Sequence, residues 1–514
     1  MLLPKGVLPF IALLFIISSQ TSFAHDGHDE QDMTVTKLGN LGKVDFAVSC
    51  SADSQKAMNT GVALLHHMMY AQAEVFFDRW IKKSPECAML YWGYSMTLFH
   101  PLWPDTITEE ALVRGEKALA KSRQLKVSAR ENDYIKAASA YYENWSQQSE
   151  QTRIKAWAKA QQRVFANNAN DVDAIALHAL SLLVTADKKD VSFAQQKQAG
   201  KLLDNIFKQA STHPGAIHYS IHAYDNPVLA ELGIEKARAY DQIAPDVPHA
   251  LHMPSHVFVR LGMWPDVISW NSRSAKAALK YPTKGATSMH YIHAIDYLLY
   301  GHLQENNDAA ARKVVASIAE HHPIQATFPA AYALTTIPAR LALENHQWRQ
   351  ASQLKLRTPS YFNWDKFPEV EAISYFSRGV GAARSGDLNA ANENLKMLDI
   401  LHHKVMKTSP SYWAVLVDAQ RKTVAAWINY AQGNKAQAIA LLKNAADMED
   451  AMDKNPVTPG AVIPVRELLA DMYMLNSNYA AALKAYQLCL QINPQRLNSV
   501  SGTTLARQKI KDKR

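Results

Sequence analysis

Pairs of helices with small and aromatic residues at recurring positions constrain the fold of this chain more than any other sequence feature. Near the C-terminus, residues 468–473 and 478–486 form two apolar runs with helical spacing, joined by a short polar turn and closed by Pro494. Residues 425–453 and 61–85 repeat this arrangement. One such pair cannot bury its own apolar face, so neighbouring pairs must stack into one continuous core.

This arrangement is typical of tetratricopeptide (TPR) repeats, in which small residues lie where helices cross and proline ends the second helix. Apolar residues recur at three- and four-residue spacing along nearly the whole chain, and no alternating strand pattern with hairpin turns is present. We therefore predict an all-α, TPR-like α-solenoid of about eleven antiparallel helix pairs between residues 50 and 495.

Several segments also resemble a family of exported bacterial TPR proteins. They include residues 87–93, 100–103, 213–219 and 249–256, the last of which reads His-Ala-Leu-His-Met-Pro-Ser-His. The resemblance extends over most of the chain after its leader. It implies a right-handed superhelix whose first helices line a concave groove for peptides or partner proteins, and it implies no catalytic residues.

The N-terminal segment from Met1 to Ala24 is typical of an export signal. Lys5 is followed by an apolar stretch at positions 7–17 and by Ser-Phe-Ala at 22–24, which predicts cleavage after Ala24 and a periplasmic or secreted protein. That stretch is too short to span a bilayer, and no later stretch approaches the roughly 20 apolar residues that a span needs. We therefore expect no membrane span.

Cleavage after Ala24 would place His25 at the new N-terminus, close to His28. A terminal amine and imidazole nitrogens suit copper, so this leader is a candidate N-terminal metal site. The alternative is a solvated leader that contains histidine and acidic residues without binding metal.

The predicted organisation has five parts. They are a signal peptide at 1–24, a polar leader rich in His and acidic residues at 25–46, an N-terminal and central solenoid at 47–357, C-terminal repeats at 358–500 and a basic tail at 501–514. The boundary near 357 rests on a turn-rich, aromatic stretch at residues 357–364.

Charge and cysteine content exclude several classes of partner and site. The chain has 55 Lys and Arg against 47 Asp and Glu, and this excess is spread thinly, so we expect no nucleic-acid partner. Three cysteines cannot build a zinc site of four thiolates. In an oxidising compartment, we predict a disulfide between Cys50 and Cys87 and a buried free thiol at Cys489, while pairing of Cys489 with either partner stays open.

Histidines concentrate in the central repeats. Nine of the twenty fall between positions 213 and 302. The TPR period is about 34 residues. One such period separates His218 from His252, and His222, His256 and His290 follow one another at the same interval. These side chains should therefore occupy equivalent places on successive first helices.

Within two of these helices the histidines also form i,i+4 pairs, which lie on one helix face. Imidazoles from adjacent helices build zinc, copper or iron sites in helical proteins. The candidate metal or ligand residues are His218, His222, His252, His256, His290, His293, Asp225 and Asp296.

The competing interpretation is that these histidines are structural. They would then bond to the hydroxyls of Tyr219, Tyr224 or Tyr291, or to the backbone. Pro254, between His252 and His256, also threatens the i,i+4 geometry. No Glu follows the zinc-protease order beside these histidines, so hydrolase chemistry has no support.

Two functions follow from these patterns. The leading prediction is an exported TPR binding or scaffold protein whose concave groove holds a peptide, a protein or a small ligand. The alternative is a metalloprotein, including a metal-dependent enzyme or a redox protein, with copper, zinc or iron at the histidine-rich site. The sequence leaves open whether there is catalysis and what the oligomeric state is.

Overall fold

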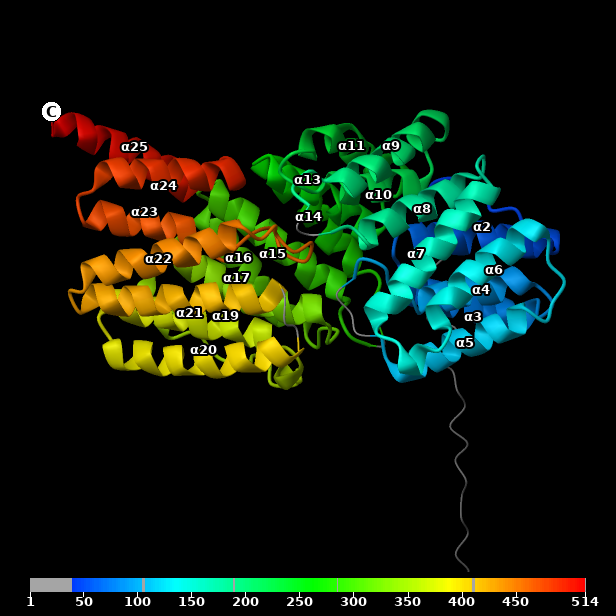
Figure 1. Cartoon of the computed structure of the whole chain (residues 1–514), viewed down its shortest axis with the longest axis horizontal. Helices are drawn as coiled ribbons and strands as arrows, with labels where there is room; N and C mark the ends of the chain where they lie inside the picture. The colour runs from blue at the N-terminus through cyan, green and yellow to red at the C-terminus, as the bar shows by residue number, and fades with distance from the viewer. Residues whose placement is uncertain (1–38, 104–106, 188–189, 284, 409–411, 514) are drawn as a thin grey trace, which may run out of the picture.

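The computed structural model describes residues 39–103, 107–187, 190–283, 285–408 and 412–513, and it is helical throughout (Figure 1). Apart from two isolated bridges, these residues form no β-structure. The α-helices are α2 Ala52–His66, α3 Tyr70–Lys83, α4 Ala88–Thr97, α5 Glu109–Ser122, α6 Ala129–Tyr142, α7 Glu150–Asn167, α8 Val172–Val184, α9 Ala194–Gln209, α10 Pro214–Tyr224, α11 Ile234–Ile243, α12 Pro248–His252, α13 Pro254–Arg260, α14 Trp264–Ala278, α15 Met289–Gln304, α16 Asp308–Ser317, α17 Phe328–Glu344, α18 Trp348–Ser352, α19 Pro368–Ser385, α20 Leu388–Thr408, α21 Tyr412–Ala431, α22 Lys435–Asp450, α23 Val465–Leu475, α24 Tyr479–Ile492 and α25 Leu497–Asp512.

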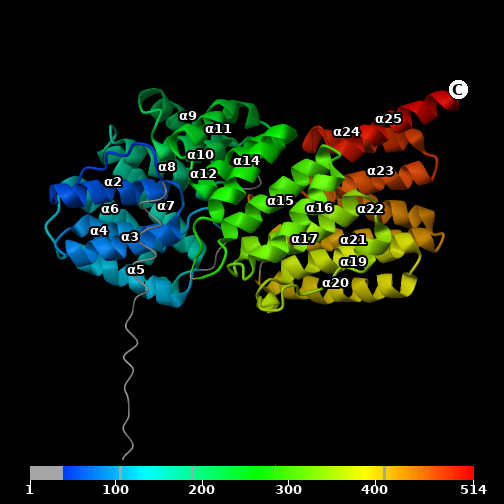
Figure 2. The same ribbon diagram turned by 180° about the vertical axis from the view of Figure 1, so that it is seen from behind.

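The described helices form eleven antiparallel pairs followed by α25, with α12 and α13 together serving as one first helix. Successive pairs stack through their first helices, since α15 packs on α17, α17 on α19 and α19 on α21. The pairs lie along an elongated molecule, with α2–α8 at one end and α19–α25 at the other (Figures 1 and 2). The predicted all-α, TPR-like solenoid is confirmed, including the number of helix pairs.

Glycines allow neighbouring helices to meet around an aromatic ring, as the repeat pattern predicts. A Cβ atom added to Gly61 on α2 or to Gly93 on α4 would lie 2.3 Å from the ring of Phe77. Phe77, on α3, is fully buried between them. Any side chain at either glycine would push these helices apart, because buried rings have no room to retreat.

Buried apolar residues form two large cores that share the region of α14 and α15. The aromatic stretch at 357–364, where the sequence suggests a boundary, lies within the second core, because Phe362 and Trp364 are both buried there. The histidine-rich helices therefore lie where the two cores meet.

The first pair is attached to the rest of the chain by covalent and aromatic contacts. Cys50 and Cys87 form the predicted disulfide, with Cα atoms 5.5 Å apart, and Cys489 is a buried free thiol. Phe46, four residues before Cys50, is fully buried and stacks on Trp92. This end of the predicted polar leader is therefore part of the core.

Two predictions concern the N-terminal segment, which the structure does not describe. The signal peptide at 1–24 and the N-terminal metal residues His25 and His28 lie outside the described residues. Within the described part of the chain, no helix is both long and apolar enough to cross a bilayer.

The connection between α22 and α23, residues 451–464, runs along the inside of the second half, and we name it the inner segment. Residues 457–460 and 462–464 of this segment are buried. Arg340 on α17 donates hydrogen bonds to the carbonyls of Gly460 and Ala461 and to the hydroxyl of Thr458. The first helices thus hold a stretch of the protein's own backbone that follows turns and bends without regular secondary structure.

Candidate metal centre

Three neighbouring first helices carry the histidines that the sequence singles out. His218 and His222 lie on α10, and His252 and His256 lie on α12 and α13. On α15 the repeat interval points to His290, and His293 lies three residues beyond it. Pro254 does interrupt the second of these helices, but Met253 keeps right-handed helical dihedrals, with φ −52° and ψ −39°. Because the backbone keeps its helical course there, His252 and His256 still project from one face.

His252, His256 and His293 converge on one buried point. Each offers a ring nitrogen, and the three nitrogens lie within 4.8 Å of one another. The ring centroids of His252 and His293 are 4.3 Å apart, and those of His252 and His256 are 5.1 Å apart. All three residues are at most 8% exposed, so they form a compact buried cluster of imidazoles.

Hydrogen bonds determine which nitrogen of His252 carries the proton. Asn271 on α14 donates from its amide nitrogen to the carbonyl of Val267, at 2.7 Å, so its amide oxygen must face the other way. That oxygen lies 2.8 Å from Nδ1 of His252, which therefore donates to it. A neutral His252 consequently has its proton on Nδ1 and a bare lone pair on Nε2.

His256 has the same tautomer for a different reason. Its Nδ1 lies 2.9 Å from Oδ2 of Asp225, and a carboxylate can only accept a hydrogen bond. Burial lowers the pKa of His256 below its ordinary value of 6.5, although Asp225 opposes this shift. His256 is therefore neutral near pH 7, with its Nε2 also bare.

The two bare nitrogens face one another. Nε2 of His252 lies 3.2 Å from Nε2 of His256. Burial, and then His293 and His256, lower the pKa of His252 well below 6.5, so no proton is available to join the two lone pairs. Two nitrogens that share a tetrahedral zinc ion lie roughly 3.3–3.4 Å apart, since each Zn–N bond is about 2.05 Å. The arrangement is therefore that of two ligands prepared for one cation.

The third histidine offers another unpaired nitrogen. Nδ1 of His293 is buried and has no hydrogen-bond partner. Burial, and then His256, lower the pKa of His293 well below 6.5, which leaves it neutral. Three neutral imidazoles are the protein ligands of one type of zinc site.

Charged residues behind His256 hold its orientation. Asp225 accepts from Nε of Arg260 and from Nζ of Lys454, in addition to His256. Arg260 in turn pairs with Asp453. Two carboxylates and two cations balance within this network, and Asp225 acts as the orienting carboxylate that metal-bound histidines commonly have.

A second buried cluster shows how histidines are satisfied here without a metal. Oδ1 of Asp173 accepts from Nε2 of His66, at 2.8 Å, and from Nε2 of His213, at 3.2 Å. The remaining nitrogen of His66 accepts from the hydroxyl of Tyr219, and that of His213 from the backbone N–H of Ala216. Every ring nitrogen has a compatible partner, so this cluster is a complete hydrogen-bond network.

The structure places the other predicted residues around this centre or away from it. His218 and His222 continue the row of imidazoles along α10, and the His222 and His256 centroids are 6.2 Å apart. His290 lies farther along, 5.4 Å from His249 between centroids. Asp296 faces elsewhere, since it accepts from Thr336 and Arg340.

Sequence reasoning missed Asn271, His249 and Lys454. His249 lies one helical turn before His252, so helical spacing could have added it to the candidates. Asn271 and Lys454 reach the site from α14 and from the inner segment, both far from His252 along the chain, and no local pattern points to them.

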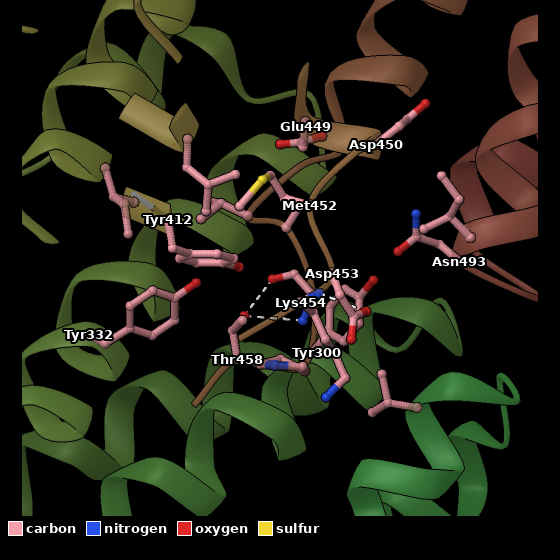
Figure 3. Close-up of a pocket in the computed structure, with 18 of the residues that line it drawn as sticks. Tyr300, Tyr332, Tyr412, Glu449, Asp450, Met452, Asp453, Lys454, Thr458 and Asn493 are labelled. Atoms are coloured by element: carbon pink, nitrogen blue, oxygen red, sulfur yellow. Dashed lines mark hydrogen bonds between the residues drawn. The ribbon is translucent and has the colours of Figure 1, made fainter. Parts of the chain in front are cut away.

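A cavity of about 110 Å³ lies beside the charged network, between the inner segment and the first helices. Figure 3 shows Tyr332 and Tyr412 on one side of it and Lys454 and Thr458 on the other. Burial raises the pKa of Glu449 in its wall to about 8. Aromatic, charged and aliphatic side chains line the cavity, which shares Arg260, Asp453 and Lys454 with the charged network.

Comparison with known proteins finds solved TPR structures of distant similarity. No protein-family model matches the chain, and no curated protein matches it in sequence. The solved TPR domain of P58(IPK) is similar over 90% of this chain and 99% of its own, with 12% identity and a TM-score of 0.21. Yeast Tom70 is similar over 89% of this chain and 96% of its own, with 10% identity and a TM-score of 0.31. The narrower resemblance to an exported bacterial TPR family stays a prediction.

Proposed function

We propose that this chain is a metal-binding helical-repeat protein whose ion is held by His252, His256 and His293. The observation that supports this most directly is the 3.2 Å approach of two Nε2 atoms whose protons are held on the opposite side of each ring. Without a cation, two buried lone pairs face one another, and neither Nε2 atom has the hydrogen-bond donor that a buried acceptor normally has. Imidazole ligands favour zinc or copper over the oxygen-preferring magnesium and calcium.

Elemental analysis tests this proposal on the full chain, purified without a histidine tag. We expect near-stoichiometric zinc or copper in the wild type and its loss in a His252→Ala/His256→Ala variant. A His402→Ala/His403→Ala variant removes the same number of histidines from α20 and should keep the metal. Circular dichroism establishes that each variant is folded. Equal metal content in the two variants, or none in the wild type after incubation with excess ion, would contradict the proposal.

A specific contact also supports a second candidate function, the binding of peptides that are not helical. We propose that the first helices of the second half bind an irregular segment of a partner protein in the way that they bind the inner segment. Arg340 supports this, because it recognises backbone carbonyls of Gly460 and Ala461, which any sequence offers. Concave surfaces of repeat proteins commonly serve this purpose.

A peptide supplied in trans tests this second candidate. The variant replaces residues 456–463 by a Gly/Ser linker, which keeps the backbone carbonyls but lacks the buried side chains of Val457, Val462 and Ile463. A labelled synthetic peptide of the native sequence should displace this linker and bind, and the added substitution Arg340→Met should abolish binding. Fluorescence anisotropy measures both. Absence of peptide binding to a folded linker variant would refute the candidate.

A further inference from the structure

The cavity between the inner segment and the first helices has in its wall a carboxyl group without a counterion among the described residues. This group is the side chain of Glu449. Within the described part of the chain it accepts one hydrogen bond, from the backbone N–H of Val465 at 2.7 Å, and it forms no ion pair. A carboxylate has two oxygens and can accept several hydrogen bonds. Glu449 therefore keeps most of its capacity to bind a donor.

The cations around Glu449 and in the cavity wall are already paired with other carboxylates. The pairs are Arg466 with Asp447 and Asp450, Arg496 with Glu344 and Glu467, Arg260 with Asp225 and Asp453, and Lys454 with Asp225. Burial, together with Asp450, raises the pKa of Glu449 to about 8. Near pH 7 this carboxyl therefore holds a proton where a counterion could lie.

The rest of the wall suits an alkyl chain that ends in hydrogen-bond donors. Oε1 of Gln420 is a further acceptor, since it is buried and has no hydrogen-bond partner. Aromatic side chains also line the cavity, and Figure 3 labels three of them. They are Trp264, Tyr300, Tyr332, Tyr412 and Trp413. Aromatic faces attract both alkyl groups and cations.

The size of the cavity limits its ligand to a small molecule or to the end of one side chain. Its volume is about 110 Å³. An apolar protein cavity of roughly 150 Å³ holds a benzene ring, so this one has room for about five non-hydrogen atoms. The n-butylammonium ion, which has the length of a lysine side chain, is of this size.

We propose that this cavity binds a primary alkylammonium group, which donates hydrogen bonds to Glu449 and Gln420 while its alkyl chain packs on the aromatic rings. A primary ammonium has three N–H donors and no acceptor, and it complements a wall with unsatisfied acceptors. A free amine and the lysine side chain of a partner protein share this chemistry. The inference goes beyond the proposed metal site, since none of the three metal-binding histidines lines the cavity.

Isothermal titration calorimetry of the full chain at pH 7 tests this inference. We expect n-butylammonium chloride to bind roughly 10-fold or more tightly than n-butanol, a neutral molecule of the same size, because only the ammonium forms a charge-assisted hydrogen bond with Glu449. The ammonium replaces the proton of Glu449, so binding should release close to one proton, measured in buffers of different ionisation enthalpy. Glu449→Gln should lose this preference and the proton release. Glu305→Gln, on an exposed turn, should behave as the wild type.

A lysine derivative distinguishes the two sources of the ammonium. Nα-acetyl-lysine-N-methylamide carries the same group on a peptide-like backbone. Equal or tighter binding than that of n-butylammonium would assign the cavity to a partner's lysine, and weaker binding would assign it to a free amine.

Three results would overturn the inference: no binding of either amine, equal affinities for n-butylammonium and n-butanol, or undiminished ammonium binding by Glu449→Gln. If that variant does not fold, the release of a proton by the wild type still decides, because an ammonium that binds away from Glu449 would release none. The metal content of the same protein is measured separately, so each proposal can fail without the other.

Discussion

Nε2 of His252 lies 3.2 Å from Nε2 of His256, and neither nitrogen carries a proton, because Asn271 and Asp225 hold the protons on the opposite side of each ring. The relationship depends on Asn271 and Asp225, which lie outside the proposed set of three ligands. These hydrogen bonds should therefore affect how tightly the three histidines bind a metal ion.

The contact of Asn271 with His252 should control metal affinity. Asn271→Leu removes the acceptor that fixes the tautomer of His252, and loss of such an orienting group typically lowers affinity about 10–100-fold. Competition with a chromophoric zinc chelator measures the change. Asn394→Leu is the matched control, since Asn394 is also buried but bonds to a backbone carbonyl of α20. Equal affinities in the two variants would show that the tautomer does not matter.

The ion pair of Arg340 with Asp296 should be important for stability. Both side chains are at most 1% exposed, and Arg340 also holds the inner segment. Arg340→Met leaves a buried carboxylate unpaired, which we expect to lower the free energy of unfolding by about 3–5 kcal/mol. Urea denaturation measures this. Asp296→Asn added to Arg340→Met should recover part of the loss, whereas Arg312→Gln, which breaks a half-exposed pair, should cost less than about 1 kcal/mol.

Glu449 should make the folded chain less stable as the pH rises from 4.5 to about 8. Burial, reinforced by Asp450, raises its pKa from 4.5 to about 8, so the folded chain holds a proton that the unfolded chain has released between these values. Stability is therefore highest at the acidic end and falls as pH rises through about 8. Glu449→Gln should flatten this part of the profile, measured by denaturation at a series of pH values, and Glu305→Gln on an exposed turn should leave it unchanged. A parallel shift of the Glu449→Gln profile, without flattening, would contradict the assignment.

The disulfide should stabilise the first helix pairs by restricting the unfolded chain. Cys50 and Cys87 are 37 residues apart, which corresponds to about 3–4 kcal/mol in the chain-entropy description. Thermal unfolding of Cys50→Ser/Cys87→Ser should occur at a lower temperature than that of the wild type and should not respond to reductant. Cys489→Ala should keep the full response to reductant, because Cys489 is unpaired. If reductant leaves the unfolding temperature of the wild type unchanged, the disulfide contributes nothing to stability.

The repeat pattern alone determined the fold class and the number of helix pairs, because stacking of amphipathic pairs requires small and aromatic residues at fixed intervals. The same interval determined which histidines share a face, since positions one repeat apart are equivalent on successive first helices. For this reason His252 and His256 were recognisable as candidates, while His293 entered the set only because it lies three residues beyond His290. The pairing of Cys50 with Cys87 followed from the predicted oxidising compartment and their early positions.

Only the tertiary structure decided which ring nitrogens are bare. That property depends on Asn271, Asp225 and Lys454, which arrive from other helices and from the inner segment and follow no repeat. The tertiary structure also decided that His66 and His213 have a hydrogen-bond partner in Asp173, although their surroundings in the sequence resemble those of the other histidines. A periodic sequence places side chains on a face, whereas the state of a buried imidazole depends on every group within hydrogen-bond reach, and most of those groups are distant along the chain.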